Sequence, residues 1–309
     1  MLLNIQLFIY ILLSFVSSSC EPSKNTNGGL SFNELLVEIR EENISPKDAQ
    51  KEFQRIIKEL HEIYNPAKYD SLNMDLVFPL KRKNYRSVGG KGRGYYGRQF
   101  DLFDHSVAKS HPAHDIFIYD LNKDCKDDTE QDYVDVLAVN NSVVIATETN
   151  WSEETGYKGG NFVWLYDLES GGIWYYAHQR KVYVVINQLV NKGDKIGEVG
   201  RTGFNAKTNR SDTHLHLMYL KVDEQFNPTP VNHYLWLKKA KTVYEASLPT
   251  HYPRKEISAR IIPSSAVRCI NTIFNAKELG FVSENRNANI KQQNQWNSGI
   301  LKSQKKYKR

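Results

Sequence analysis

Short runs of apolar residues separated by turn residues dominate the middle of the chain. From Leu76 onward many runs alternate apolar with polar side chains, which is the period of a β-strand. Asn, Gly and Asp stand between them, as tight hairpin connections require. The pattern predicts strands at 134–139, 142–147, 161–166, 173–177, 182–186, 195–199 and 213–220. Because no long helix separates these strands, we expect a mainly β fold, an antiparallel β-sheet sandwich rather than a parallel βαβ sheet.

Two segments before the strands have helical periodicity instead. Ser31–Glu42 and Pro46–Tyr64 carry apolar residues at helical spacing, with Ser45 as the N-cap of the second helix and Pro46 at its first position. We expect a small N-terminal helical segment that packs on the β domain, although a pro-segment covering a cleft has the same pattern. A further short helix is expected at Val231–Lys241.

The first residues predict export. Met1–Ser19 is largely apolar and ends in small residues, and its apolar core is shorter than the roughly 20 residues that span a bilayer. Ser17–Cys20 resembles the end of a bacterial lipoprotein signal, which would attach the chain to a membrane through a lipidated Cys20; plain cleavage and an uncleaved anchor are the alternatives. The chain is therefore expected in the cell envelope, in the periplasm or as a membrane-anchored lipoprotein. An oxidising compartment permits, without requiring, a disulfide between Cys125 and Cys269.

Composition divides the chain into four parts and limits the classes of partner. We expect an export segment at 1–20, a linker and helical segment at 21–75, the β domain at 76–240, and a C-terminal extension with a basic, disordered tail at 241–309. The net charge is +6, and much of it lies in Phe281–Arg309, which has seven Lys/Arg and one Glu. The sequence therefore predicts no nucleic-acid partner. It leaves the oligomeric state open.

Two short histidine-containing stretches carry the candidate chemistry. They are His-Pro-Ala-His-Asp at 111–115 and Thr-His-Leu-His at 213–216. Three imidazole or carboxylate ligands with one open position are the usual arrangement of catalytic zinc. The two stretches therefore predict a zinc site, with five possible ligands: His111, His114, Asp115, His214 and His216.

The backbone must bring these side chains together. His214 and His216 share one face of the predicted strand, because alternate residues of a strand point the same way. His111 and Asp115 would lie roughly 13 Å apart in a straight strand. We therefore expect a bend at Pro112-Ala113, with Asp115 opening an apolar strand at Ile116–Tyr119.

Four motifs in order resemble those of the lysostaphin/LytM-type zinc metalloendopeptidases, which hydrolyse bacterial cell walls. The motifs are His111-x-x-x-Asp115, Tyr176-Ala177-His178, the glycine-rich run Gly193–Gly203 and His214-Leu215-His216. The resemblance covers about 76–240. It implies a zinc-containing groove on a β fold and a zinc-dependent endopeptidase that cuts peptide cross-links of peptidoglycan. The alternative is a catalytically inactive relative that binds the wall or activates another hydrolase, and the intact set of motif histidines and aspartate speaks against it.

Carried onto this chain, the resemblance assigns a role to each motif residue. His111, Asp115 and His216 would bind zinc, while His178 and His214 would be catalytic. Since no H-E-x-x-H glutamate is present, a histidine must serve as the base: His214 would take a proton from the attacking water, and protonated His178 would help to stabilise the oxyanion. These two roles could be reversed. His114 is expected in the second shell or at the surface, and a variant in which His214 and His216 both bind zinc is geometrically possible.

Several features depart from this pattern or suggest another one. Ala113, Thr213 and Asn141-Ser142 stand where the family usually has Gly, Pro and Gly. Gly92–Gly97 formally matches a dinucleotide-binding motif but lacks the flanking strand and helix, so we expect a flexible surface loop, with a cleft-lining Tyr95 or Tyr96 as the alternative. Val190–Gly197 resembles the strand turn of biotinyl and lipoyl carrier domains, although no suitable hairpin lysine is evident.

Overall fold

The computed structural model describes residues 29, 31–67, 70, 74–104, 110–155, 158–207 and 211–246, which lie within one compact unit, Gly29–Pro253. The predicted export signal, Cys20, Cys269 and the basic tail lie outside the described residues. Export, lipidation, the disulfide and a disordered tail therefore stay predictions, as do the domain boundaries. Within the described part of the chain, no helix has the length and apolar content to span a membrane.

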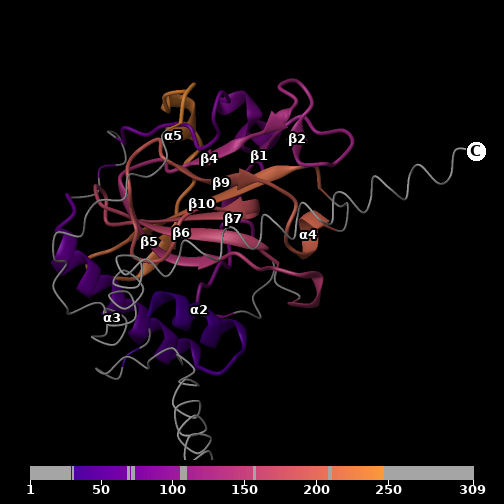
Figure 1. Ribbon diagram of the computed structural model, residues 1–309. Helices are drawn as coiled ribbons and strands as arrows, with labels where there is room; N and C mark the ends of the chain where they lie inside the picture. The colour runs from indigo at the N-terminus through magenta and orange to yellow at the C-terminus, as the bar shows by residue number, and fades with distance from the viewer. Residues whose placement is uncertain are drawn as a thin grey trace, which may run out of the picture. The chain divides into compact units, whose positions relative to one another are not determined.

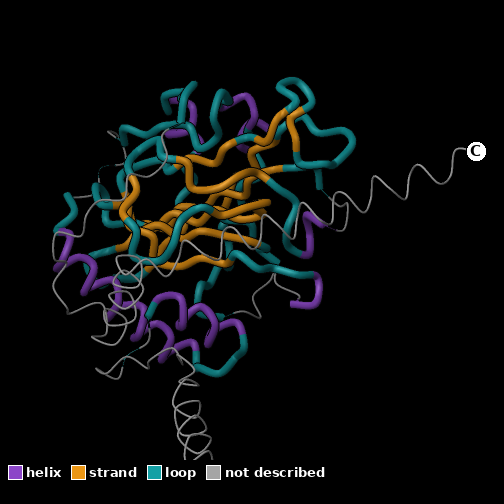
Figure 2. The backbone as a smooth tube through the Cα atoms, viewed as in Figure 1, coloured by secondary structure: helices purple, strands orange, loops and turns teal. Residues whose placement is uncertain are grey.

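An antiparallel sheet of nine strands forms the centre of the unit (Figures 1 and 2). The strands follow one another in the order β1-β10-β7-β6-β5-β8, β11 pairs with β10, and β9 joins β4 to β7. The prediction of a mainly antiparallel β fold is thus confirmed. The bounds are β1 Ala113–Phe117, β4 Asp135–Leu137, β5 Ser142–Glu148, β6 Asn161–Asp167, β7 Ile173–Val182, β8 Leu189–Val190, β9 Lys195–Val199, β10 His214–Val222 and β11 Pro228–Pro230, with β2 Lys126–Asp127 and β3 Asp132–Tyr133 as a separate ribbon.

Two predicted strands were misplaced. No strand occupies 182–186: β7 runs on to Val182, and a loop follows in which Val185 is 66% exposed, so its run of apolar residues does not mark a buried strand. The first strand begins at Ala113 rather than at Asp115, because pairing with β10 already starts there. The predicted final helix is shorter than expected, α5 at Tyr234–Lys239.

Both N-terminal helices exist where the periodicity placed them. α2 spans Phe32–Arg40 and begins with a capping box between Ser31 and Glu34; α3 spans Pro46–Tyr64 and begins at the cap Ser45. Their apolar faces pack on one face of the sheet, where they share a cluster with Trp164, Met218 and Leu220, among others. The buried residues that the two helices contribute to this cluster are Phe32, Leu35, Ile39, Ala49, Phe53, Ile56 and Ile57.

The alternation along β10 decides which face carries the candidate site. Leu215, Leu217 and Tyr219 lie in a second apolar cluster, which also contains buried residues of β4 and β9. Met218 and Leu220 belong to the cluster beneath the helices. Since His214 and His216 share the parity of Met218, they project from the same sheet face that α2 and α3 cover further along.

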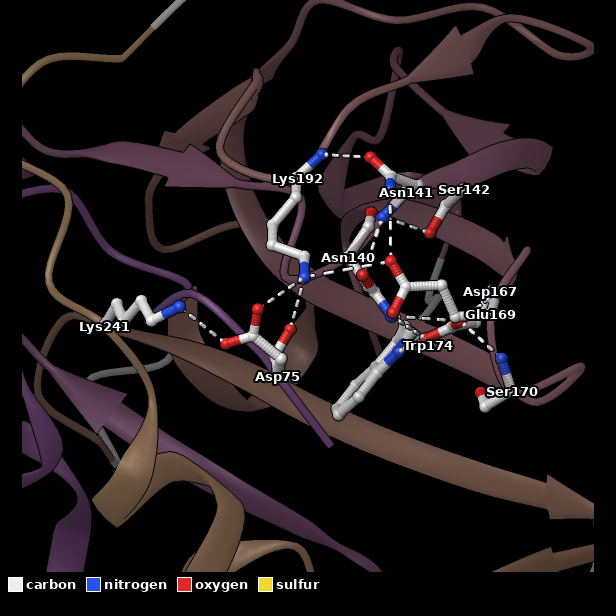
Figure 3. Close-up of polar contacts among 10 residues, drawn as sticks. All are labelled: Asp75, Asn140, Asn141, Ser142, Asp167, Glu169, Ser170, Trp174, Lys192 and Lys241. Carbon is white, nitrogen blue, oxygen red and sulfur yellow. Dashed lines mark hydrogen bonds and ion pairs between the residues drawn. The ribbon is translucent and has the colours of Figure 1, made fainter. Parts of the chain in front are cut away.

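A buried polar network holds the hairpin ends together away from that face (Figure 3). Asp167 is fully buried and accepts hydrogen bonds from Trp174 Nε1 at 2.9 Å and from Asn140 Nδ2 at 3.2 Å. Asn141 Oδ1 accepts from the backbone of Lys192 at 3.0 Å. The polar Asn140-Asn141 turn thus uses both side chains to fix neighbouring turns.

Candidate metal centre and active site

Three predicted ligands converge at the edge of the sheet. The ligating atoms of His111, Asp115 and His216 all lie within 4.8 Å of one another. Asp115 and His216 face each other as a cross-strand pair of β1 and β10. The backbone of His111 instead pairs with Tyr96, at 2.8 and 2.9 Å. The chain therefore changes partner across Pro112, and this change places His111 beside Asp115 as the predicted bend requires.

The hydrogen bonds of His111 fix its tautomer. A carbonyl oxygen can only accept, so Nδ1 donates to Gly94 O, at 3.0 Å. In the neutral ring, Nε2 then carries a lone pair instead of a proton, and this nitrogen lies 3.2 Å from Asp115 Oδ1. His216 Nδ1 lies 3.1 Å from the same oxygen. Two facing acceptors repel unless they share a proton or a cation, and metal-binding histidines usually donate their other N–H to a carbonyl or carboxylate. The donor set therefore fits a zinc ion.

Charge at this centre is distributed between one acid and four imidazoles. Burial raises the pKa of Asp115, but hydrogen bonds with His111 and His216 outweigh burial and hold that pKa well below its usual range. For His111, burial lowers the pKa and the Asp115 hydrogen bond raises it, with a net rise. Burial lowers the pKa of His214, and it lowers the pKa of His178 to about 3 with His214 as a further cause. Asp115 is thus ionised and both His178 and His214 are neutral near pH 7.

His178 is positioned by two loops that approach each other closely. Its backbone N–H donates to Gly159 O at 2.8 Å, and its Nδ1 donates to Thr202 O at 2.8 Å. The residue has a φ of 62°, in the left-handed region. Gly160 makes the approach possible, since a Cβ there would lie 2.3 Å from the Thr202 carbonyl carbon. The free Nε2 of His178 belongs to a ring centred 4.9 Å from that of His214.

His214 is fixed by the loop that precedes it. Its Nδ1 lies 2.7 Å from Asp212 O and therefore donates to that carbonyl, while Ser211 Oγ lies 3.2 Å from the same nitrogen. Its Nε2 lies 3.6 Å from Asp115 Oδ1. His214 is outside the group of three converging ligands, although it shares the strand face of His216. The geometry places both predicted catalytic histidines beside the candidate metal site with Nε2 unprotonated.

A buried arginine anchors the same loop. Arg201 is 8% exposed and donates to Thr213 Oγ1 at 3.1 Å, to Ala206 O at 2.8 Å and to Ser211 O at 2.9 Å. Thr213 in turn donates to Asp120 Oδ2 at 2.6 Å. Thr213, which stands where the family usually has Pro, therefore links Arg201 to Asp120. The short helix α4, Phe204–Lys207, lies within the loop that Arg201 anchors.

His114 lies away from the metal centre. It is 1% exposed, so the surface alternative was wrong, and its Nε2 lies 3.0 Å from Asn232 Oδ1. That oxygen also accepts from the backbone of Tyr234 at 3.2 Å. The ring packs against buried His233, with centroids 4.8 Å apart. His114 thus belongs to the core behind β1 and is not among the three residues whose ligating atoms converge.

A cleft of about 660 Å³ lies over these residues. Its floor comes from the sheet, and further lining comes from the segment 100–104 and from Lys158-Gly159. Among the described residues, α2 and α3 contribute none of the lining. They support it indirectly, because the Phe53 ring of α3 packs on Phe103, with centroids 5.5 Å apart. The lining includes Phe100, Leu102, His111, Asp115, Trp164, Tyr175, His178, His214, His216 and Met218.

The glycine-rich segment Gly92–Gly97 lies largely at the surface, as predicted, but it also contacts His111, which was not predicted. Gly94 orients His111 through its carbonyl, and Tyr96 both pairs with the backbone of His111 and places its ring 5.5 Å from the imidazole. The segment is thus part of the support of the site and not only a surface loop. Gly94 and His111 are 17 residues apart in the sequence, and neither helical nor strand periodicity predicts a contact between them.

Comparison with known proteins finds a similar family for part of the chain. The model of "Peptidase family M23" matches residues 126–228. The matched residues, about a third of the chain, are similar to peptidase family M23. The matched residues include His178, His214 and His216 but begin after His111 and Asp115. No curated protein sequence matches.

Several solved structures of M23 peptidases and related proteins are similar in part. Lysostaphin from Staphylococcus simulans is 23% identical over 48% of this chain and 51% of its own, with a TM-score of 0.30. A putative glycyl-glycine endopeptidase LytM from Ruminococcus gnavus is 20% identical over 68% and 84%, with a TM-score of 0.37. A zinc-containing peptidase from Vibrio cholerae is 18% identical over 58% and 42%, with a TM-score of 0.31. The chain thus spans about half of the lysostaphin chain.

Proposed function

We propose that this chain is a member of peptidase family M23 and a zinc-dependent endopeptidase that hydrolyses peptide bonds in peptidoglycan cross-links. The single observation that carries the proposal is the convergence of His111, Asp115 and His216 within 4.8 Å, beside two further neutral histidines in a cleft. The peptidoglycan substrate comes from the resemblance of the four motifs to wall endopeptidases. An exported location in the cell envelope, with Cys20 as a possible lipid attachment, belongs to the same proposal.

The three converging residues would hold zinc, and His178 and His214 would move protons. Zinc would supply a Lewis acid that polarises the peptide carbonyl and lowers the pKa of water. His214 suits the role of base, because Asp115 Oδ1 at 3.6 Å favours the imidazolium that forms. His178 rests as a neutral ring oriented by Thr202, so it could help to stabilise an oxyanion only after it takes up a proton.

The test compares His216→Ala with the parent protein. The variant should lose bound zinc, measured by metal analysis, together with the release of soluble peptides from purified peptidoglycan. His61→Ala, a histidine of α3 outside the cleft lining, should keep both. Mass analysis of the released fragments would identify the bond that is cut. A parent protein that binds one zinc per chain but cleaves no wall type would instead be an inactive relative that binds the wall or activates another hydrolase.

A further inference from the structure

A strongly basic segment runs beside the candidate active site. Lys81–Arg98 contains seven Lys/Arg and no Asp/Glu. It forms the short helices η1, Tyr85–Ser87, and η2, Gly89–Gly92. Antiparallel bridges from Val88 to Ile116 and from Tyr96 to His111 hold the segment along β1. The charge is therefore fixed on the folded unit rather than carried by a free tail.

The segment lines a hollow that is separate from the catalytic cleft. The hollow has a volume of about 660 Å³ and shares no lining residue with the cleft. Phe117 contributes to its lining, and the Phe117 ring lies 5.3 Å from that of His214. The charged and hydroxyl-bearing lining residues are Lys83, Arg86, Ser87, Lys91, Arg93 and Thr129, together with the carboxylate of Asp127.

Most of the positive charge at the hollow is not neutralised. Lys83 is paired with Asp127 at 2.8 Å and with Glu130 at 2.9 Å. Arg86 and Lys91 are exposed, and neither makes an ion pair with any residue in the described part of the chain. Arg93 donates through Nε to Gly90 O, which leaves its charge uncompensated as well.

The backbone of η2 holds these side chains against β1. Gly90 and Lys91 both have left-handed backbone, with φ of 57° and 55°. A Cβ at Gly89 would lie 2.6 Å from the Phe117 ring, so the close contact requires glycine. This packing keeps Lys91 and Arg93 beside the hollow and places the hollow next to the catalytic cleft.

We infer that this hollow binds an anionic polymer through its phosphate or carboxylate oxyanions. Arginine forks pair with either group, and several uncompensated cations along one segment match a chain of anions better than a single ion. Binding here would hold the polymer beside the cleft. The inference goes beyond peptide hydrolysis and does not depend on it.

The test measures binding of the full-length protein to long-chain polyphosphate and to poly-L-glutamate. Arg86→Gln/Lys91→Gln should bind roughly tenfold more weakly, because each basic side chain near an anionic surface contributes a several-fold factor. The matched control is Lys47→Gln/Lys58→Gln, which removes the same charge from exposed lysines of α3 and should stay within about twofold of the parent. A loss confined to one polymer identifies phosphate or carboxylate as the ligand.

Equal binding by the two double variants with both polymers would overturn the inference. Circular dichroism and zinc content of Arg86→Gln/Lys91→Gln should match the parent, since neither side chain contributes to the core or the metal centre. The zinc-site variant His216→Ala should keep polymer binding. Failure of the peptidase proposal and failure of this inference are therefore separate results.

Discussion

His178 has one ring nitrogen committed to Thr202 and the other turned to the cleft, and this arrangement makes its role testable. His178→Ala should keep zinc, because His178 is not among the three converging ligands. Turnover should fall by about 10²–10⁴, the usual contribution of a positioned proton-transfer group. Zinc content and kcat on the same preparation are the measurements. Full activity would remove His178 from the mechanism.

His114 differs from His178 because its importance lies in packing. Its ring is 1% exposed and contacts His233, so His114→Ala leaves a cavity behind β1. We expect a loss of about 2–4 kcal/mol in the free energy of unfolding, in the range of other large-to-small core changes. Bound zinc per folded chain should stay unchanged. Urea unfolding and metal analysis check this, and loss of zinc from a folded variant would contradict the placement of His114 outside the metal centre.

The positions of the site residues followed from sequence, whereas their supports did not. The parity of His214 and His216 follows from strand periodicity, and the bend at Pro112 follows from the distance that His111 and Asp115 must close. Gly94 and Thr202, in contrast, act through backbone carbonyls. A carbonyl is common to every residue type, so the sequence contains no signal for such a contact.

At the scale of elements, the loop that precedes β10 is fixed by Arg201. Its guanidinium bonds Thr213 and two carbonyls, so Arg201→Met should allow the segment around Ser211 and His214 to shift. We expect zinc to remain and kcat to fall by about tenfold or more, because small misplacements of a catalytic group are costly. Arg201→Lys, which keeps the charge, should recover part of the activity. A rise in KM with unchanged kcat would show that the loop binds substrate without orienting His214.

Strand prediction succeeded where side chains alternate between two buried environments. β9, at Lys195–Val199, has the predicted bounds, and α3 has the bounds that Ser45, Pro46 and the apolar spacing predicted. The prediction failed at 182–186, where apolar residues cover a loop and Val184 is buried without strand pairing. A local pattern of apolar residues indicates which side chains are buried. The buried segment forms a strand only where a partner strand is available for pairing.

At the scale of the whole unit, the N-terminal helices are part of the core rather than a separate cover. Phe53 and Ile57 of α3 are fully buried, and Leu35 of α2 is 1% exposed. Each such side chain contributes about 1.5–3 kcal/mol, against a total of about 5–15 kcal/mol for a typical domain. Deleting residues 31–67 should therefore unfold or strongly destabilise the chain, as thermal melting and intrinsic fluorescence would show.

The same geometry argues against release of these helices as the step that activates the protein. A removable pro-segment would occupy the cleft, but the described cleft lining includes no residue of α2 or α3. Phe53→Ala tests this without a deletion: losing the contact with Phe103 should cost about 3–5 kcal/mol and loosen the segment 100–104 that lines the cleft. Activity of the folded variant should fall or stay level. The deletion of residues 31–67 and Phe53→Ala share one contradicting outcome. A folded form of either variant that hydrolyses peptidoglycan faster than the parent would support an inhibitory segment, because loosening a group that blocks the cleft raises turnover.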